Sequence, residues 1–593
     1  MDNQKIAEIF QEMGDMLEIQ GANRFRVLAY QKAARTIADL PRELNDIYRK
    51  DPGKLEELPG IGKDLAGKIV ELLKTGKCRA HQDMLKTFDR GLLEILRVRG
   101  VGPKKVQLFY SKLGIDSIVK LKKAAAHGQL RDLPGMGEKS ESEVLKALGE
   151  YAMHQERMLL AVALHTAEKI VEYMKKCKFV RRVEYAGSLR RMKDTVGDID
   201  VLAAAKNPEK DHAKIMDFFL KYPEVKDVIA RGETKSAVIL KNGVQSDLRV
   251  LDEKIYGAAL HYFTGSKAHN VMVRDRAKKM GMKLNEYGIF KVTRGGEKLI
   301  GGRTEEEVFK IVGLPYIPPE LREDRGEIEA GSKHKLPDLI ELKDLRGDLH
   351  VHSRWSDGTQ EIEEIARGYR EAGFEYIVMS DHSPAVAVAH GLTSERFKMQ
   401  WDEIDEINAD FEKEAKRSAG LLKSARTFKI FKGVECDILP DGRMDLPDSI
   451  LKKMDIVIAS VHSRFNMSEK EMTERVLNAF KNPYVKIFGH PSGRLINRRE
   501  PYHIDMEKII DAAVHRGIAL EINSQPDRLD LQDYYCKMAR DRGAKFVVNS
   551  DGHNTSQMDF LRYGMAVARR GWLTKGDVIN TKSLKDLMKF FSL

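Results

Sequence analysis

After about residue 345, six apolar runs of the chain each end in a side chain that can bind a metal ion. The runs are DLHVHS, YIVMSDHS, FKGVECD, IVIASVHS, VKIFGH and KFVVNSDGH, which begin at residues 348, 376, 431, 456, 485 and 545. Runs rich in Val and Ile that alternate with helix-like segments predict the parallel strands of a βα barrel. Because such barrels carry their chemistry at the carboxyl ends of the strands, the metal-binding residue types stand where an active site would form.

These candidate ligands outnumber what one ion can use. A zinc ion takes about four ligands and an octahedral ion about six, so nine candidates predict two or three metal ions. Clustered metals indicate phosphoester hydrolysis, since one ion can activate water while its neighbours hold the phosphate oxygens. A single His at a strand end is more simply a structural residue, but nine such residues together are not. Arg354 and Arg464 are candidates for orienting the phosphate. The predicted ligands are His350, His352, Asp357, His382, Glu435, His462, His490, Asp551 and His553.

The motifs HVHS, SDH, GVE, SVHS, GHP and SDGH resemble those of the PHP (polymerase and histidinol phosphatase) family. The resemblance covers residues 346–593 and implies a distorted seven-stranded barrel with a trinuclear site. Mn²⁺, Zn²⁺ and Fe²⁺ are the metals expected there. His390, His503 and His515 match no ligand position of the family pattern.

The bulk composition excludes some classes of protein. A chain of 593 residues is too long for one hydrophobic core, so several domains are expected. It has no apolar run long enough for a membrane span and no secretory leader, which predicts a cytoplasmic protein. Its four cysteines form no CxxC pair, which argues against a disulfide framework. The net charge of +11 suits a polyanionic partner but also fits a merely soluble basic protein.

One short unit occurs three times in the helical N-terminal region: LPGIGKDLAGKI from residue 58, VRGVGPKKVQLF from residue 98 and LPGMGEKSESEV from residue 133. Each copy is an apolar residue, a Gly-x-Gly turn and an amphipathic helix, and resembles the helix-hairpin-helix motif. The glycines let the backbone approach a phosphate, and the N–H groups that open the next helix attract it. The units therefore predict sequence-independent DNA binding. The third, with Glu138 after its glycines, is expected to be mainly structural. The DNA-binding glycines are Gly60, Gly62, Gly100 and Gly102.

The segment GSLRRMKDTVGDIDVL, residues 187–202, predicts a second metal site. Strand alternation places Asp198 and Asp200 on one face, and Asp247 lies on another apolar strand that can pair alongside. Three carboxylates suit two Mg²⁺ or Mn²⁺ ions, which would activate a 3′-hydroxyl and neutralise nucleotide phosphates. DxD alone is often a solvated strand end, but with GS and the later SD strand it indicates a nucleotidyltransferase. The groups expected to bind the nucleotide phosphates are Gly187, Ser188, Arg191 and Gly197.

The segment HYFTGSKAHN, residues 261–270, resembles the nucleotide-binding YFTGS segment of family X DNA polymerases. The resemblance extends over residues 1–318. It implies that Tyr262 and Phe263 line the sugar pocket, that Gly265 gives the sugar room, and that Asn270 reaches the base or the primer terminus. Either aromatic ring alone would also fit a core helix.

In that family the first domain can carry a lyase that removes a 5′-deoxyribose phosphate through a lysine Schiff base. Lys68 matches the nucleophile position and Tyr30 matches a tyrosine of that site. Asp64 stands where repair members often carry another lysine, which weakens phosphate binding. Met192 replaces a glycine common in other members. The alternative for Lys68 is a solvated or phosphate-contacting helix lysine.

The combined pattern predicts a multidomain α+β and α/β protein that resembles prokaryotic family X polymerases with a C-terminal PHP domain. The expected function is gap-filling synthesis on gapped or nicked DNA from deoxynucleoside triphosphates, with a 3′–5′ exonuclease or 3′-phosphatase that also cuts at abasic sites. A monomer is expected. The alternatives are a small-molecule phosphoesterase targeted to DNA and a non-catalytic DNA-bridging scaffold. The expected domains are a lyase-like helical domain (1–85), a DNA-gripping subdomain (86–150), a nucleotidyltransferase palm (151–255), a nucleotide-selecting subdomain (256–318), a linker (319–345) and the PHP domain (346–593).

Overall fold

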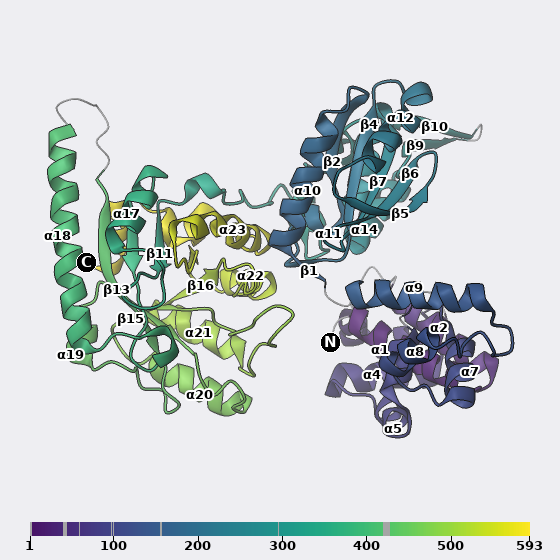
Figure 1. The fold of residues 1–593 in the computed structure, drawn as a ribbon, viewed down its shortest axis with the longest axis horizontal. Coiled ribbons are helices and arrows are strands. Elements are labelled where there is room, and N and C mark those ends of the chain that lie inside the picture. The colour runs from purple at the N-terminus through teal and green to yellow at the C-terminus, as the bar shows by residue number, and fades with distance from the viewer. Residues whose placement is uncertain are drawn as a thin grey trace. The chain divides into compact units, whose positions relative to one another are not determined.

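A computed structural model of the chain describes residues 3–38, 44–58, 60–96, 98, 100–154, 157–293, 296–418 and 427–593. The chain divides into two units, residues 1–156 and residues 157–593. Below, the second unit is treated as a sheet part (residues 157–318) and a barrel part (residues 346–593), joined by residues 319–345 (Figure 1).

The first unit is helical throughout its described residues. Apolar side chains such as Phe10, Ile69, Phe109 and Leu121 recur at helical spacing and form its core. The helices are α1 (Asn3–Ile19), α2 (Arg24–Ala38), α3 (Leu44–Lys50), α4 (Lys63–Thr75), α5 (Arg79–Thr87), α6 (Arg90–Leu96), α7 (Pro103–Leu113), α8 (Ile118–Ala126) and α9 (Glu138–His154).

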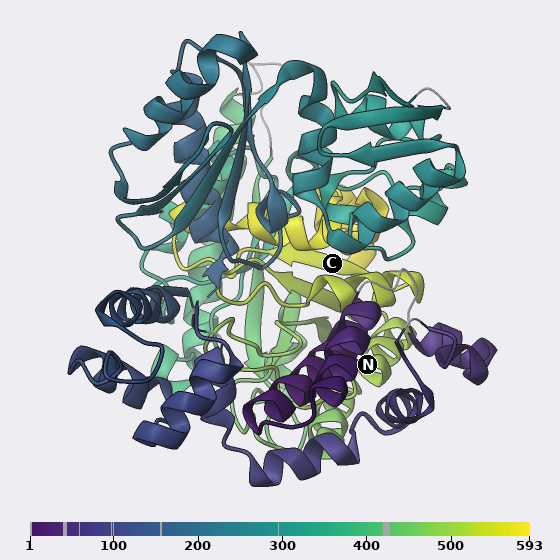
Figure 2. The ribbon, with the colours of Figure 1, turned by 90° about the vertical axis from the view of Figure 1, so that its right-hand side faces the viewer.

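The sheet part contains a short antiparallel pair, β1 (Met158–Leu159) with β3 (Thr195–Val196), and two larger sheets that are separate from each other (Figure 2). The larger has the order β2-β4-β7-β6-β5, in which only β4 and β7 are parallel neighbours. Its strands are β2 (Val180–Tyr185), β4 (Ile199–Ala205), β5 (Val225–Arg231), β6 (Lys235–Leu240) and β7 (Gln245–Asp252). The smaller is the antiparallel sheet β8 (Met282–Asn285), β9 (Gly288–Thr293) and β10 (Gly296–Gly301). The helices that the site uses are α10 (Leu160–Lys175), α11 (Gly187–Arg190), α12 (Pro208–Leu220), α13 (Tyr256–Thr264), α14 (Lys267–Lys279) and α15 (Glu305–Ile311).

The predicted linker is packed over much of its length. Leu321, Arg322 and Glu327 are buried, and the segment contains the short helix α16 (Glu327–Ser332). A flexible linker would leave its charged side chains in water, whereas these are buried. Residues 319–345 are therefore a packed part of the second unit.

The barrel part has seven parallel strands in sequence order, as the family resemblance implied. The bridge between Val351 and Gly552 brings the first strand to the last, so the barrel is nearly closed. Each of the six apolar runs forms a strand, and the seventh is ALEIN at residues 519–523. The strands are β11 (Gly347–Val351), β12 (Tyr376–Met379), β13 (Lys429–Asp437), β14 (Ile456–Ser460), β15 (Val485–Phe488), β16 (Ala519–Asn523) and β17 (Phe546–Asn549).

Helices follow the strands on the outside of the barrel, and the longest, α18, stands at its edge (Figure 1). They bury one apolar face each, as Ile365 and Tyr369 of α17 do. These helices are α17 (Ile362–Glu371), α18 (Ser394–Ser418), α19 (Asp448–Leu451), α20 (Glu469–Ala479), α21 (Met506–Arg516), α22 (Asp533–Asp541), α23 (Leu561–Arg570) and α24 (Leu584–Phe591).

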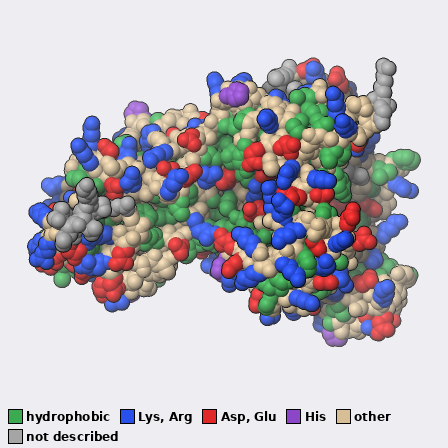
Figure 3. Space-filling model, turned by 90° about the horizontal axis from the view of Figure 1, so that it is seen from above, with side chains coloured by type: hydrophobic (Ala, Val, Ile, Leu, Met, Phe, Trp, Pro, Cys, Tyr) green, Lys and Arg blue, Asp and Glu red, His purple; other side chains and the backbone are tan. Residues whose placement is uncertain are grey.

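The surface mixes both signs of charge. On the face in Figure 3, Lys and Arg side chains are interspersed with Asp and Glu, so the net charge of +11 does not form one continuous patch there. Within the ranges that the structure describes, no helix has the length and apolar character that a membrane crossing requires.

Candidate active sites

The nine predicted ligands gather at the carboxyl ends of the barrel strands. Glu435, on β13, lies at the centre of the cluster. Its Oε1 is 2.8 Å from Nε2 of His490 and 3.1 Å from Nε2 of His462. Its Oε2 is 3.1 Å from Nδ1 of His382 and 3.3 Å from Nε2 of His350. One buried carboxylate therefore faces five imidazoles from four different strand ends, since Nε2 of His352 also lies 3.6 Å from its Oε2.

The other members extend this cluster on either side. Asp551 Oδ1 lies 3.1 Å from Nε2 of His352, and Asp357 Oδ2 lies 3.4 Å from His553 and 3.6 Å from His382. These residues form three sets, and within each set the potential ligand atoms all lie within 4.8 Å of one another. The sets are His352, Asp357, His382 and His553; His350, His352 and Asp551; and His382, Glu435 and His462.

The donor set fits metal ions. Nε2 of His350, both ring nitrogens of His352 and Nδ1 of His382 are buried and make no well-oriented hydrogen bond among the described residues, although carboxylate oxygens lie 3.1–3.8 Å from them. Buried polar atoms are costly unless something satisfies them. Burial alone would raise the pKa of Glu435, but His462, His382 and His350 hold it well below its usual range. Ionised carboxylates beside unpaired imidazole nitrogens are the groups that divalent transition metals bind.

A second layer of carboxylates orients these ligands. Glu521 Oε1 is 2.7 Å from Nδ1 of His350, and Glu521 Oε2 accepts from the backbone N–H of His490 at 2.7 Å. Asp437 Oδ1 lies 3.2 Å from Nδ1 of His462. A carboxylate on the far nitrogen fixes the tautomer and orientation of a ligating His. Sequence reasoning missed both residues, although the run ALEIN carries Glu521 and the run FKGVECD ends in Asp437.

The arginines near this cluster differ in their contacts. Arg354 is exposed and bonds to Glu361 and to the backbone O of Thr359. Arg464 is exposed and has no side-chain partner in the described part of the chain. Arg528, which sequence reasoning missed, places Nε 4.0 Å from Oδ2 of Asp551. Arg528 therefore lies beside a candidate ligand at the edge of the cluster.

The three predicted carboxylates of the sheet part meet on its two parallel strands. Asp200 on β4 is the register partner of Asp247 on β7, and Asp198 immediately precedes β4. Burial, followed by repulsion from Asp198 and Asp247, raises the pKa of Asp200 to about 6. Lys235 Nζ lies 2.6 Å from Asp247 Oδ2. Mutual repulsion of this kind is relieved by bound cations, so these residues fit divalent metals.

Gly187 adjoins this carboxylate group. Its φ is +66°, and a Cβ there would lie 2.9 Å from Oδ2 of Asp200. Only glycine therefore lets the turn into α11 pass so close to the carboxylate. Ser188 follows within α11, and Gly197 stands directly before Asp198.

Arg191 connects α11 with the predicted nucleotide-selecting segment. Its Nη1 donates to the backbone O of Thr264 at 2.5 Å, and its Nε donates to Glu323 at 2.9 Å. Gly265 has φ +69°, and a Cβ there would lie 3.2 Å from Nη1 of Arg191. The residue predicted to bind the phosphates, Arg191, is thus a direct neighbour of Gly265, which is predicted to give the sugar room.

The aromatic residues of this segment lie at the end of α13. The rings of Tyr262 and Phe263 are 5.1 Å apart, and the guanidinium of Arg249 lies 4.4 Å from the centre of the Phe263 ring. Asn270 donates from Nδ2 to the backbone O of Tyr262, while its buried Oδ1 has no partner in the described ranges. Arg249 had no role in the sequence-based prediction, although QSDLRVL places it two residues after Asp247.

The first unit holds the predicted hairpins and Lys68. Gly60 and Gly100 have φ of +80° and +78°, and Gly62 and Gly102 cap the amino ends of α4 and α7. The free N–H groups that open α4 begin directly after its glycine turn, and those of α7 begin one residue later, because α7 starts with Pro103.

Lys68 lies on α4, with Nζ 6.0 Å from the centre of the Tyr30 ring. Its Nζ donates to Asp64 at 2.5 Å. Burial alone would lower the pKa of Lys68, but the hydrogen bond and charge of Asp64 together with Tyr30 outweigh it, and the pKa is raised. The amine is therefore less often neutral than that of a free lysine.

Comparison with known protein families finds four matching regions. A model of the DNA polymerase beta thumb matches residues 259–323, and a model of the PHP domain matches residues 348–525. A helix-hairpin-helix domain model matches residues 1–78, and a SAM-like helix-hairpin-helix tandem matches residues 92–150.

Individual relatives agree with these assignments. The protein of Bacillus subtilis (strain 168) named DNA polymerase/3′-5′ exonuclease PolX is 38% identical over 592 residues, which are 100% of this chain and 99% of that protein. A probable phosphatase of Thermoanaerobacter sp. (strain X514) is 31% identical over 256 residues, 41% of this chain and 94% of that protein. A probable phosphatase of Caldanaerobacter subterraneus is 40% identical over 135 residues, 21% of this chain and 51% of that protein.

A mixed sheet with three clustered carboxylates, joined to a metal-binding βα barrel, defines a nucleotidyltransferase fused to a phosphoesterase. The chain belongs to the family X DNA polymerases that carry a C-terminal PHP domain.

Proposed function

We propose that this protein fills short gaps in DNA and that its barrel prepares 3′ ends for that synthesis. The observation that carries the proposal is the register of Asp200 with Asp247 on adjacent parallel strands, with Asp198 two residues earlier and Gly187 against Asp200. The substrates are DNA and deoxynucleoside triphosphates, and both centres depend on metals. We also propose that the protein is cytoplasmic and acts on DNA as a monomer.

In the polymerising centre, Asp198, Asp200 and Asp247 would hold Mg²⁺ or Mn²⁺, which supplies positive charge for the triphosphate and the primer hydroxyl. The N–H groups of Gly187 and Ser188 and the guanidinium of Arg191 would bind the phosphates. Because Arg191 also donates to the backbone O of Thr264, it orients the segment that follows. The sugar and the base would be contacted by four residues, Tyr262, Phe263, Gly265 and Asn270.

In the barrel, the nine clustered side chains would hold two or three ions of Mn²⁺, Zn²⁺ or Fe²⁺, which supply an activated water and charge for the phosphate oxygens. Glu521 and Asp437 orient the ligating His350 and His462. Arg528 lies at the edge of the cluster, where its guanidinium can bind a phosphate oxygen. The expected reactions are removal of a 3′-nucleotide or a 3′-phosphate, and cutting at abasic sites.

A second candidate function for the barrel is small-molecule phosphoester hydrolysis. It is favoured by the Thermoanaerobacter relative, because that probable phosphatase matches this chain over 94% of its own length but over only 41% of this chain. A non-catalytic scaffold is disfavoured, since both centres retain their full sets of predicted ligands.

Wild-type protein loaded with Mn²⁺ distinguishes these functions. On a labelled duplex with a short gap, we expect templated extension from a 3′-hydroxyl and removal of a 3′-phosphate before extension. Hydrolysis of a small phosphate ester without any action on 3′-phosphate or 3′-hydroxyl DNA would favour the second candidate.

A lyase at Lys68 remains a prediction, and Asp64 offers a test of it. A Schiff base requires the neutral amine, and Asp64 raises the pKa of Lys68. Asp64→Asn removes that charge, so we expect the pKa of Lys68 to fall and borohydride trapping on an incised abasic duplex to rise several-fold. Lys68→Ala should abolish trapping. If the Ala variant traps as much DNA as wild type, the nucleophile is another residue.

A further inference from the structure

The barrel part reaches the nucleotide-binding helix of the sheet part through one buried arginine. Arg570 ends α23 of the barrel, and its side chain is only 3% exposed. Nη1 donates to the backbone O of Arg191 at 2.8 Å and to Glu323 at 3.0 Å. Nη2 donates to Asp533 at the start of α22. An arginine of the phosphoesterase part therefore contacts the residue that follows α11 in the polymerising part.

Glu323 extends the same contact to the side chain of Arg191. Its Oε1 accepts from Nη1 of Arg570 and from Nε of Arg191. The Arg191 guanidinium is thus held by Glu323 on one side and by the backbone O of Thr264 on the other. Arg570 fixes the main chain of Arg191 directly and its side chain through Glu323.

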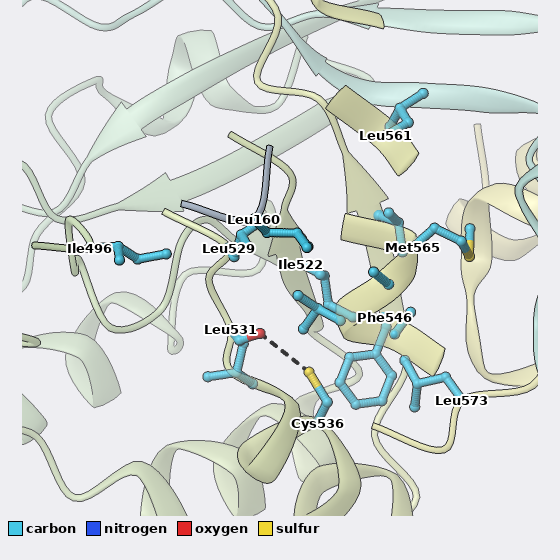
Figure 4. Close-up of a cluster of buried hydrophobic side chains, with 14 of the residues drawn as sticks. Leu160, Ile496, Ile522, Leu529, Leu531, Cys536, Phe546, Leu561, Met565 and Leu573 are labelled. Atoms are coloured by element: carbon cyan, nitrogen blue, oxygen red, sulfur yellow. Dashed lines mark hydrogen bonds between the residues drawn. The ribbon is translucent and has the colours of Figure 1, made fainter. Parts of the chain in front are cut away.

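The surrounding packing makes this link rigid. Leu160, which begins α10, belongs to the same apolar core as Leu529 and Met565 of the barrel part (Figure 4). Asp194, in the loop after Arg191, pairs with Arg494 of the barrel at 2.9 Å. In a continuous core of this kind, displacement of one group is transmitted to its neighbours.

We propose that Arg570 is a positioning residue for nucleotide addition, so that the barrel part supplies support for the nucleotide pocket through the Arg570–Glu323–Arg191 contacts. The inference rests on the proposed role of Arg191 in binding nucleotide phosphates. Arg570 does not touch the substrate. Its effect is on the orientation of the guanidinium that does.

The test uses Arg570→Lys in the full-length protein, because Lys keeps the buried charge but cannot make the same paired contacts. We expect KM for the incoming nucleotide in gap filling to rise about tenfold, the scale of a lost charge-assisted hydrogen bond, while kcat changes little. Hydrolysis of a 3′-phosphate by the barrel should stay at the wild-type rate. The matched control is Arg569→Lys, because Arg569 precedes Arg570 on α23 but bonds to Glu320 and to the backbone O of Ile340. We expect it to leave both activities unchanged.

Glu323→Gln provides a second variant that keeps the side-chain volume and leaves Arg570 in place. It should also raise the nucleotide KM, and the double variant should be no worse than the more impaired single variant, since both interrupt one chain of contacts. Additive effects would contradict the proposal, as would an unchanged KM in folded Arg570→Lys protein. Parallel loss of extension and hydrolysis together with a lower melting temperature would mean a purely structural role. If wild type itself fails to extend a primer, the proposed function fails. If wild type extends a primer but the nucleotide KM is the same in the Arg570→Lys and Glu323→Gln variants, only the proposed role of Arg570 fails.

Discussion

Replacing Asp198 and Asp200 with Asn should abolish primer extension on a gapped duplex and leave 3′-phosphate removal intact. Asn keeps the shape of the side chain but removes the charge that holds the metals beside Asp247. We expect extension to fall by at least about 10³-fold, or ~4 kcal/mol of transition-state stabilisation. The measurement is single-nucleotide incorporation with Mg²⁺ or Mn²⁺, followed on a denaturing gel.

The matched control for this variant is Asp217→Asn. Asp217 lies on α12 of the same part and pairs with Arg231 on the surface, so extension should be unchanged. DNA binding by the double variant should stay near wild type, because the predicted hairpins belong to the first unit. Undiminished extension by the double variant would refute the assignment of the polymerising centre.

Replacing His350 and His352 with Ala should produce the reverse separation of activities. The two residues provide ligand atoms in two of the three candidate metal groups, and His350 also faces the central Glu435. We expect bound transition metal to decrease and hydrolysis of a 3′-phosphate to fall by at least about 10²-fold. Extension from a 3′-hydroxyl should remain. Metal content by atomic emission and phosphate release from labelled DNA measure the two effects.

His515→Ala is the control for that experiment, because His515 is exposed on α21 and matches no ligand position. If the double His variant keeps its metal and its hydrolytic rate, the barrel cluster is not the hydrolytic centre. If it also loses extension while remaining folded, the two activities share a step that the present assignment does not contain.

The sequence predicted correctly those features that depend on a few neighbouring residues. All six apolar runs form strands, because a short apolar run rich in Val and Ile is a property of a few neighbouring residues. Their ligands converge because the carboxyl ends of parallel strands meet at one end of a barrel. The sequence also predicted that the strand carrying Asp247 can pair alongside the strand of Asp198 and Asp200, and the structure adds the register of Asp200 with Asp247.

The orienting carboxylates show where that reasoning stopped. Glu521 lies inside β16 rather than at its end, and its partner His350 is 171 residues away in sequence. The sequence-based prediction considered only side chains at strand ends as ligands, so it did not include Glu521. Arg528 and Arg249 were missed for a related reason. The role of an arginine depends on the carboxylate or ring that it contacts, and the sequence does not show that contact.

The sequence by itself determined the fold class, the family and the residues of the two candidate metal centres, because each depends on short segments whose side chains act together within a strand or a turn. Only the tertiary structure decided which groups support them. The Arg570–Glu323–Arg191 contacts join residues 379 and 132 positions apart from Arg191. Charged side chains at such separations can be paired only when packing has fixed where their backbones lie, and that packing depends on the whole apolar core of the second unit.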